Sequence, residues 1–197
     1  MMLNRMLRAS CVLLIALTAG CGSSPPSHFY TLDATATPRG APSANYTVAI
    51  NPVSIPTTVD RPQFVVQAGP NQVDVDEFNR WAGPLNESIA RAVAGDLATL
   101  LGTAQVVLAP PTIVEPDYRV TVNVQRFEAF PGKSVLVDAV WVVRTTKSGA
   151  TRSGHTLVQE PVQSQGFDSL AAGYSRALAK VSNDIAAAIR AESVQQP

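Results

Sequence analysis

Two stretches of the chain carry apolar residues at spacings of three and four, and this repeat restricts what the chain can fold into. The first stretch runs from Leu85 to Leu101 and the second from Leu170 to Ile189. Such a spacing places one apolar stripe on each of two amphipathic helices, and each stripe must be buried against another element. We therefore expect two long helices that pack on a common partner.

Particular residues mark the ends of both predicted helices. Gly83 and Pro84 fit the N-cap and first helical positions of the first helix, and Gly102 fits the glycine position after its last turn. Asp168 or Ser169 is expected to cap the second helix.

Alternating residues predict the partner of the helices, a β-sheet. The clearest case is 118–127, where every second residue from Tyr118 to Val124 is apolar. Further strands are expected at 29–32, 46–53, 63–67, 71–75, 104–109 (buried), 134–146 and 152–162. The pair around Ala68-Gly69-Pro70 forms a hairpin, and the last three strands form a meander. The predicted class is α/β or α+β, a single compact domain over 29–193 with a mixed β-sheet and two long amphipathic helices packed on it.

The first twenty residues predict a signal peptide. Arg5 and Arg8 precede the short apolar run 11–20, and Leu17-Thr18-Ala19-Gly20-Cys21 resembles the lipobox of bacterial lipoproteins. The resemblance implies that Cys21 becomes the first mature residue and carries a diacylglycerol and an N-acyl chain such as palmitate. No other cofactor is expected. Residues 21–28 would then be a lipidated tether, with Gly22 indicating the outer membrane by analogy with enteric sorting.

The tether is short. "GSSPPS" at 22–27 is typical of an unstructured linker, and if a strand begins near Phe29 about seven residues separate lipid from fold. At roughly 3.3–3.6 Å per residue, these residues reach about 25 Å. The domain is therefore expected to stay close to its membrane.

Composition and motifs exclude several functions. Lysine plus arginine and aspartate plus glutamate each number 15, which gives no basic excess for nucleic acid. His28 and His155 are the whole histidine inventory, and the sequence has no metal-ligand spacing, phosphate loop or nucleophile motif. The acidic cluster at 74–77 is interpreted as a solvated strand end that leads into a helix. We expect no metal site and no enzyme.

Four residues are candidates for partner docking or for a structural junction: Asp60, Arg61, Arg80 and Trp81. Trp81 is interpreted as a side chain that packs over the first helical turn as a hydrophobic staple, with an exposed partner anchor as the alternative. Arg80 is expected to pair with Asp60 or Asp76.

Four ordered motifs resemble one known family. They are Asp60-Arg61-Pro62-Gln63, Arg80-Trp81-x-x-Pro84-Leu85, Arg126-Phe127-Glu128, and Trp141 within "LVDAVWVV". Together they resemble the PqiC/YmbA-type lipoproteins, the auxiliary lipoprotein components of ABC-type or MCE-protein lipid transport systems. Gly83 departs from the small or acidic residue pattern of the family after Trp-Ala, so no role is carried over to a carboxylate there.

The resemblance implies a non-enzymatic lipoprotein on the periplasmic face of the outer membrane. Its partner would be the MCE-domain protein of an envelope-spanning transporter that moves lipids between the two membranes. A homo-oligomeric ring would suit a cap on a hexameric tube. Two alternatives remain open: a periplasmic lipid-binding carrier, and a structural envelope lipoprotein in outer-membrane assembly.

Overall fold

The computed structural model describes residues 25–38, 45–109 and 115–194, and over these ranges the fold is α+β, in agreement with the predicted class. The signal segment and Cys21 lie outside the described residues. In chain order the elements are β1 (His28–Tyr30), β2 (Val48–Ile50), β3 (Gln63–Gly69), β4 (Gln72–Trp81), α2 (Leu85–Leu101), β5 (Val106–Leu108), β6 (Tyr118–Phe130), β7 (Ser134–Thr145), β8 (Thr151–Pro161) and α3 (Phe167–Val194).

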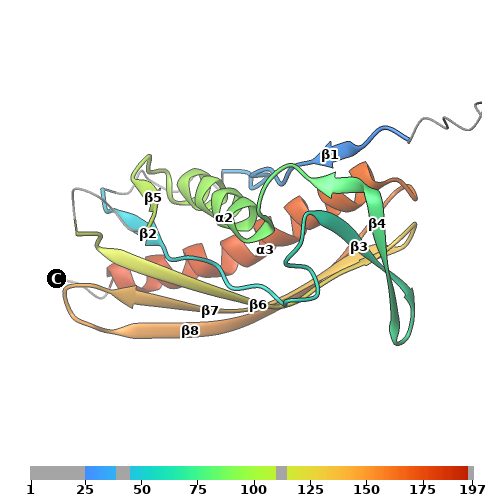
Figure 1. Ribbon diagram of the computed structural model, residues 1–197. Helices are drawn as coiled ribbons and strands as arrows, with labels where there is room; N and C mark the ends of the chain where they lie inside the picture. Colours follow the sequence, from blue (N-terminus) through green and yellow to red (C-terminus); the bar gives the residue numbers. More distant parts are fainter. Residues whose placement is uncertain (1–24, 39–44, 110–114, 195–197) are drawn as a thin grey trace, which may run out of the picture.

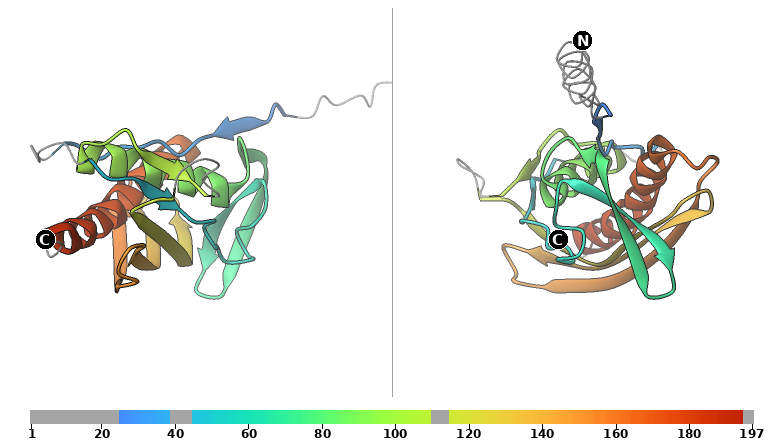
Figure 2. Two further views of the ribbon diagram at one scale, coloured as in Figure 1. Left: turned by 90° about the vertical axis from the view of Figure 1, so that its left-hand side faces the viewer. Right: turned by 45° about the vertical axis from the view of Figure 1, so that its right-hand side comes forward.

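The strands form two mixed sheets where the sequence predicted one. The large sheet has the order β5-β2-β6-β7-β8, in which β2 is parallel to both neighbours and β6, β7 and β8 form the predicted antiparallel meander. The small sheet has the order β1-β4-β3, in which β1 is parallel to β4 and β3-β4 is the predicted hairpin. Figure 2 shows the hairpin beside the large sheet, at the end of the molecule where β1 lies.

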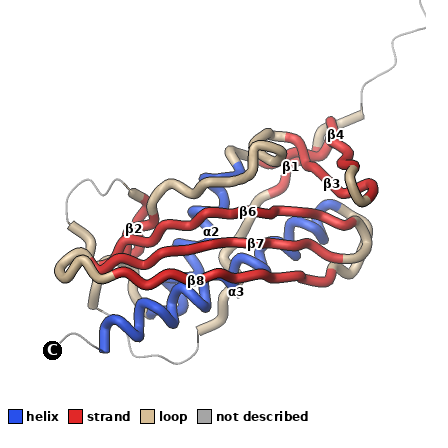
Figure 3. Tube along the Cα trace, turned by 90° about the horizontal axis from the view of Figure 1, so that it is seen from below, coloured by secondary structure: helices blue, strands red, loops and turns tan. Residues whose placement is uncertain are grey.

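Both helices pack on the same face of the large sheet, as their stripes require. Helix α3 runs along β7 and β8, and α2 packs against α3 and β5. Seen from the opposite side, the long strands lie in front of the helices (Figure 3). Leu97, Leu178 and Ile185 have exposed fractions of 0%. Within the described part of the chain, no helix is long and apolar enough to cross a membrane.

The ends of the helices differ from prediction in two details. Pro84, and not Gly83, occupies the N-cap of α2, with no side-chain cap hydrogen bond. Gly102 ends this helix in the predicted left-handed conformation, with a φ of 65°. Helix α3 begins at Phe167, before both predicted caps, because the Gly166 carbonyl accepts the first helical hydrogen bond from the Leu170 N–H.

Strand β5 also differs from prediction, because it is an exposed edge strand. Val107 and Leu108 are 37% and 41% exposed, although the apolar run at 104–109 predicted a buried strand. The run is apolar because one side faces α2, but the strand has a neighbour only in β2. An apolar run of this length does not distinguish a central strand from an edge strand.

An aromatic cluster joins the small sheet to the rest of the core. Trp81 stacks on Phe64 with ring centroids 4.1 Å apart, and Phe127 stacks on Tyr174 of α3 at 3.7 Å. Trp81 also meets both rings of the second pair at just over 6 Å. Burial raises the pKa of the Tyr174 hydroxyl well above its ordinary value. The two sheets are therefore connected through side chains from four different elements.

Residues 31–38, here called the N-terminal arm, follow β1 and are fastened to both helices. The backbone N–H groups of Thr35 and Ala36 each donate to one oxygen of Asp96 on α2, at 2.8 Å. The second oxygen of Asp96 accepts from the Ser182 hydroxyl of α3 at 3.2 Å. Asp96 has an exposed fraction of 0%, so its carboxyl satisfies three buried donors.

Ser175 and Gly95 hold the same arm at two further points. The Ser175 hydroxyl accepts from the Asp33 N–H at 3.1 Å, and its carbonyl accepts from the Thr35 hydroxyl at 3.1 Å. A Cβ at Gly95 would lie 2.7 Å from the Cβ of Ala34, so only glycine allows this close approach of arm and helix. The arm is thus part of the packed structure and not a loose extension of the tether.

A substitution at Gly154 should disrupt the packing of Trp141. The indole of Trp141 lies over Gly154 on the neighbouring strand, and a Cβ there would come within 2.1 Å of the ring. The ring is 7% exposed and donates from its N–H to Thr156, which in turn donates to Asp184 of α3. We expect Gly154→Ala to lower the free energy of unfolding by about 1–3 kcal/mol, in the range of overpacked cores.

Urea unfolding followed by circular dichroism measures this change. Ser153→Ala is the matched control, because Ser153 is an exposed neighbour on the same strand. Equal midpoints for the two variants would show that Trp141 can leave its site without cost.

Candidate functional site

Three of the four candidate residues lie around one hollow where β4 meets α2. This hollow, here called the junction pocket, has a volume of about 430 Å³. It is lined by Asp60, Arg61, Pro62, Trp81, Ala82, Gly83, Pro84 and Leu85. The loop before β3 forms one wall, and the turn from β4 into α2 forms the other.

Backbone hydrogen bonds set the shape of the junction pocket. The Trp81 N–H donates to the Pro62 carbonyl at 2.7 Å and so holds the two walls together. The Ala82 N–H donates to the carbonyl of Tyr30 on β1 at 2.9 Å. Proline at 62 and 84 restricts both walls, since each ring fixes its own φ and removes an N–H donor. The pocket is therefore a rigid feature of the fold.

Trp81 forms the floor of the pocket and does not act as a staple on the helix. Its side chain is 5% exposed and stacks on Phe64, toward the aromatic cluster. Leu85, 2% exposed, is the other apolar lining residue from the start of the stripe on α2. Asp60 and Arg61 are exposed and form a charged rim. An apolar floor with a charged rim suits a side chain of a protein partner.

Arg80 lies apart from the pocket, and its predicted pairing is wrong. Its Nε donates to the Glu77 carbonyl at 2.7 Å, and Nη2 lies 3.5 Å from the Glu77 carboxylate. Asp76, one of the expected partners, instead accepts from the N–H groups of Phe78 and Asn79. Alternation along β4 turns the Arg80 side chain to the face opposite Trp81. The acidic cluster also does not lead into a helix, because β4 continues to Trp81.

Replacing Arg80 should have little effect on stability. The side chains of Arg80 and Glu77 are 35% and 62% exposed, and an exposed ion pair contributes about 0–1 kcal/mol. We therefore expect Arg80→Ala to shift the free energy of unfolding by less than about 1 kcal/mol, measured by urea titration. A loss several times larger would mean that Arg80 supports the fold by contacts other than this pair.

The remaining motif residues stabilise the fold. Arg126 and Glu128 form a two-pronged ion pair with both distances at 2.9 Å, while Phe127 between them points into the aromatic cluster. The pKa of Arg126 is raised by its hydrogen bonds to Glu128. His155 lies on the surface of β8 as predicted, with Nε2 at 2.6 Å from Asp138. None of these residues lines the junction pocket.

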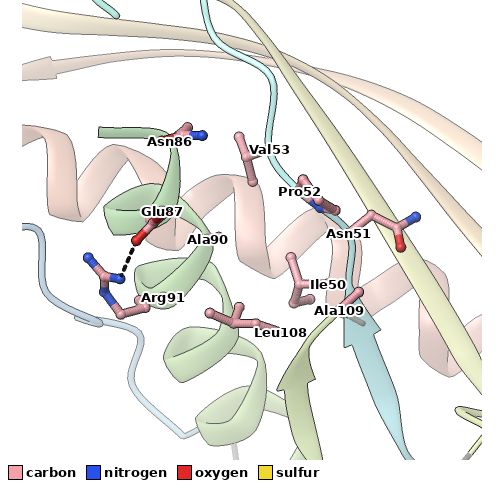
Figure 4. A pocket seen from close by; sticks show the side chains of 10 residues that line it. All are labelled: Ile50, Asn51, Pro52, Val53, Asn86, Glu87, Ala90, Arg91, Leu108 and Ala109. Carbon is pink, nitrogen blue, oxygen red and sulfur yellow. Dashed lines mark hydrogen bonds and ion pairs between the residues drawn. The ribbon is translucent and has the colours of Figure 1, made fainter. Parts of the chain in front are cut away.

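A second hollow, which the sequence did not indicate, lies between α2 and strands β2 and β5. Its volume is about 330 Å³ (Figure 4). Arg91 and Glu87 of α2 face it and pair at 3.3 Å, while Ile50 and Leu108 supply apolar contacts from the two strands. The lining comes from segments far apart in the chain, so only the fold brings it together.

The described residues offer little for catalysis. Between residues 25 and 194, outside the two undescribed loops, no group of three or more histidine, cysteine, aspartate or glutamate side chains could hold a metal ion. The junction pocket presents one carboxylate, one guanidinium and apolar surface. That set can recognise a partner by charge and shape, but it contains no nucleophile with a base beside it.

Comparisons with known proteins identify a family and a fold. The model of the family described as "ABC-type transport auxiliary lipoprotein component" matches residues 30–186. Among curated proteins, none matches the chain in sequence at a significant level.

Solved structures share the fold at low sequence identity. Protein XCC0632 from Xanthomonas campestris, assigned to family DUF330, has a TM-score of 0.72 at 20% identity, covering 87% of this chain and 100% of that one. An uncharacterised protein has a TM-score of 0.69 at 19% identity, covering 84% and 99%. A PelC dodecamer from Paraburkholderia phytofirmans has a TM-score of 0.43 at 18% identity, covering 76% and 90%.

Proposed function

The chain belongs to the family of ABC-type transport auxiliary lipoprotein components, and on that basis we propose that it is the outer-membrane-anchored, periplasmic subunit of an MCE-type intermembrane lipid transport system. The match over residues 30–186 carries this proposal, because it includes all four motifs and nearly all of the described fold. The protein acts as a non-enzymatic adapter. Its lipidated Cys21 holds it at the membrane, and the folded domain binds the MCE-domain protein.

The junction pocket is the docking site in this proposal. It combines a buried tryptophan floor with an exposed aspartate and arginine, and tryptophan and arginine are enriched at the energetic centres of interfaces. Backbone hydrogen bonds hold its walls, so a partner side chain could enter without a large ordering cost. We expect the partner to present an apolar side chain next to a carboxylate that pairs with Arg61.

Crosslinking in the intact envelope, followed by purification of the full-length lipoprotein, tests this function. We expect an MCE-domain protein to be recovered with the wild-type protein. Arg61→Glu should reduce its recovery several-fold, because the new carboxylate would repel the proposed partner carboxylate. Arg144→Glu is the matched control: Arg144 is also an exposed arginine, on β7, outside the lining of the junction pocket.

Three outcomes would contradict the proposal. Failure to recover an MCE-domain protein after crosslinking would remove the adapter function. Equal recovery with Arg61→Glu and Arg144→Glu would remove the junction pocket as the docking site. Sedimentation of the lipoprotein with inner-membrane vesicles on a density gradient would contradict the outer-membrane location.

A further inference from the structure

Two large aromatic side chains are exposed on the small sheet. Phe29 on β1 is 64% exposed and Phe78 on β4 is 39% exposed. Both would lose unfavourable contact with water if another surface covered them. Scattered exposed apolar residues are common, so the question is whether these two share a surface and what could cover it.

The strand register places both rings on one face. Phe29 pairs with Arg80, and Phe78 precedes Arg80 by two residues on the same strand. Because side chains alternate across a strand, Phe29, Phe78 and Arg80 point to the same side of the sheet. The residues between them point inward: Tyr30 packs on Phe64, and Trp81 is buried. We call Phe29 and Phe78 together the aromatic face.

A bulge in β4 presents Phe78 outward. Gln63 pairs with Arg80, but the next residue of β3, Phe64, pairs with Asp76, so residues 77–79 bulge out of the hairpin. Bulges redirect side chains and are specific features of a fold.

Hydrogen bonds stabilise this bulge. One oxygen of Asp76 accepts from the N–H groups of Phe78 and Asn79 at 2.9 and 2.8 Å, and from the Asn79 side-chain amide at 3.0 Å. The Asn79 carbonyl oxygen in turn accepts from the Tyr30 hydroxyl at 2.7 Å, which ties the bulge to β1. The fold therefore holds an exposed phenylalanine in a fixed position.

The chain leading into β1 indicates what lies opposite the aromatic face. Strand β1 begins at His28, about seven residues after Cys21, and these residues span at most about 25 Å. Phe29 itself belongs to this first strand, at the end of the molecule where the small sheet stands (Figure 2). The N-terminal arm is fixed to α2 and α3, so no further chain length can be released without breaking those contacts. A bilayer that holds Cys21 is thus within tether reach of the aromatic face.

The charges near the aromatic face are compatible with a bilayer surface. Arg80 is paired with Glu77, and the Asp76 carboxylate is occupied by three N–H donors. Phenylalanine side chains on the apolar side of surface-bound elements enter the boundary between headgroups and acyl chains. A membrane contact of this kind needs no large charge, since the lipid anchor already supplies the attachment.

We propose that the aromatic face rests on the bilayer that holds the Cys21 anchor, with Phe29 and Phe78 in the interfacial layer. This contact fixes the orientation of the domain, so that the same end always faces the membrane. The inference rests on lipid attachment at Cys21, which is part of the proposed function, but it does not depend on the identity of the protein partner.

Site-specific fluorescence on the full lipoprotein tests the contact. Cys11 leaves with the signal segment and lipidation consumes the thiol of Cys21, so one introduced cysteine gives a unique labelling site. Phe29→Cys and Phe78→Cys carry an environment-sensitive NBD label in vesicles of phosphatidylethanolamine and phosphatidylglycerol. Leu157→Cys is the matched control, because Leu157 is 57% exposed but lies on β8 of the large sheet.

We expect the labels at 29 and 78 to shift to shorter emission wavelengths in vesicles relative to detergent, and to be quenched by nitroxide-labelled lipid. The label at 157 should show neither effect. With the label at 78, the additional change Phe29→Ser should reduce nitroxide quenching, because one of the two contacts that orient the domain is lost.

Each other outcome separates this inference from the proposed function. If mass spectrometry shows acylated Cys21 but the labels at 29 and 78 behave like the label at 157, the membrane contact is wrong and the lipoprotein function stands. If the labels are shielded only after an MCE-domain protein is added, the aromatic face binds protein and not lipid. Absence of acyl chains on Cys21 would overturn both.

Discussion

Trp81→Ala should destabilise the protein by about 3–5 kcal/mol, as is typical of a buried tryptophan cut back to alanine. Trp81 is 5% exposed and stacks on Phe64 at 4.1 Å. It also meets Phe127 and Tyr174, the rings through which the small sheet joins α3 and the large sheet. The substitution would leave a cavity where the two sheets meet, and it would remove the floor of the junction pocket.

Denaturant and thermal unfolding followed by far-ultraviolet circular dichroism measure this effect. Phe29→Ala is the control, because it removes a large aromatic side chain that is 64% exposed and should leave unfolding almost unchanged. The partner recovery described above is measured in parallel. An unchanged melting temperature together with lost partner recovery would show that Trp81 serves docking and not the fold.

Asp96→Ala should cost about 2–4 kcal/mol, because it leaves the buried N–H groups of Thr35 and Ala36 without an acceptor. The Ser182 hydroxyl would lose a partner as well. Asp96→Asn keeps an amide oxygen that can accept both N–H groups, so we expect it to retain most of the stability. Hydrogen exchange should locate the loss of Asp96→Ala in the N-terminal arm. Equal unfolding midpoints for the alanine and asparagine variants would show that these hydrogen bonds contribute little.

The same carboxyl should give the protein a characteristic pH dependence. Burial raises the pKa of Asp96, and the hydrogen bonds from Ala36, Thr35 and Ser182 offset this only in part. The folded protein therefore binds a proton more readily than the unfolded chain in the window just above the ordinary carboxyl pKa. Stability falls as pH rises through that window and is level above the raised pKa. Asp96→Asn should lack this slope when urea unfolding is compared over the acidic range.

The helices were predictable because their residues encode them locally. The stripe from Leu85 to Leu101 and the closing Gly102 specify one amphipathic helix whatever it packs on, and α2 has these bounds. The beginning of α3 was missed because a backbone carbonyl, that of Gly166, begins the helix in place of a polar side chain. The exposure of β5 was missed because the position of a strand within a sheet depends on pairing, which local pattern does not record.

Bulges account for a further part of what the sequence did not show. Strict alternation holds in β6 as far as Val124, but Gln125 is inserted opposite β7, and the phase shift turns Phe127 into the core. The bulge at 77–79 likewise lets β4 continue through an acidic stretch that resembles a strand end. In both places one or more unpaired residues change which side of the strand faces inward, and the sequence carries no periodic sign of it.

The candidate site was predictable in membership but not in arrangement. Asp60, Arg61 and Trp81 were singled out by their motifs, and the fold brings them to one pocket. Arg80 was singled out with them, but alternation on β4 places its side chain on the opposite face, where it pairs with Glu77. Neighbours in sequence on a strand serve two different surfaces, which a motif read along the chain does not separate.

The fastening of the N-terminal arm also decides how the protein responds to mechanical load. A pull on the lipid anchor acts along β1, whose backbone bonds to the parallel strand β4 lie across the direction of force and resist it together. Beyond β1 the tension passes through Asp96 into α2 and through Ser175 into α3, so it is divided between both helices. A transporter that flexes between two membranes would therefore displace the whole domain before it could peel away the segment that ties the domain to its lipid.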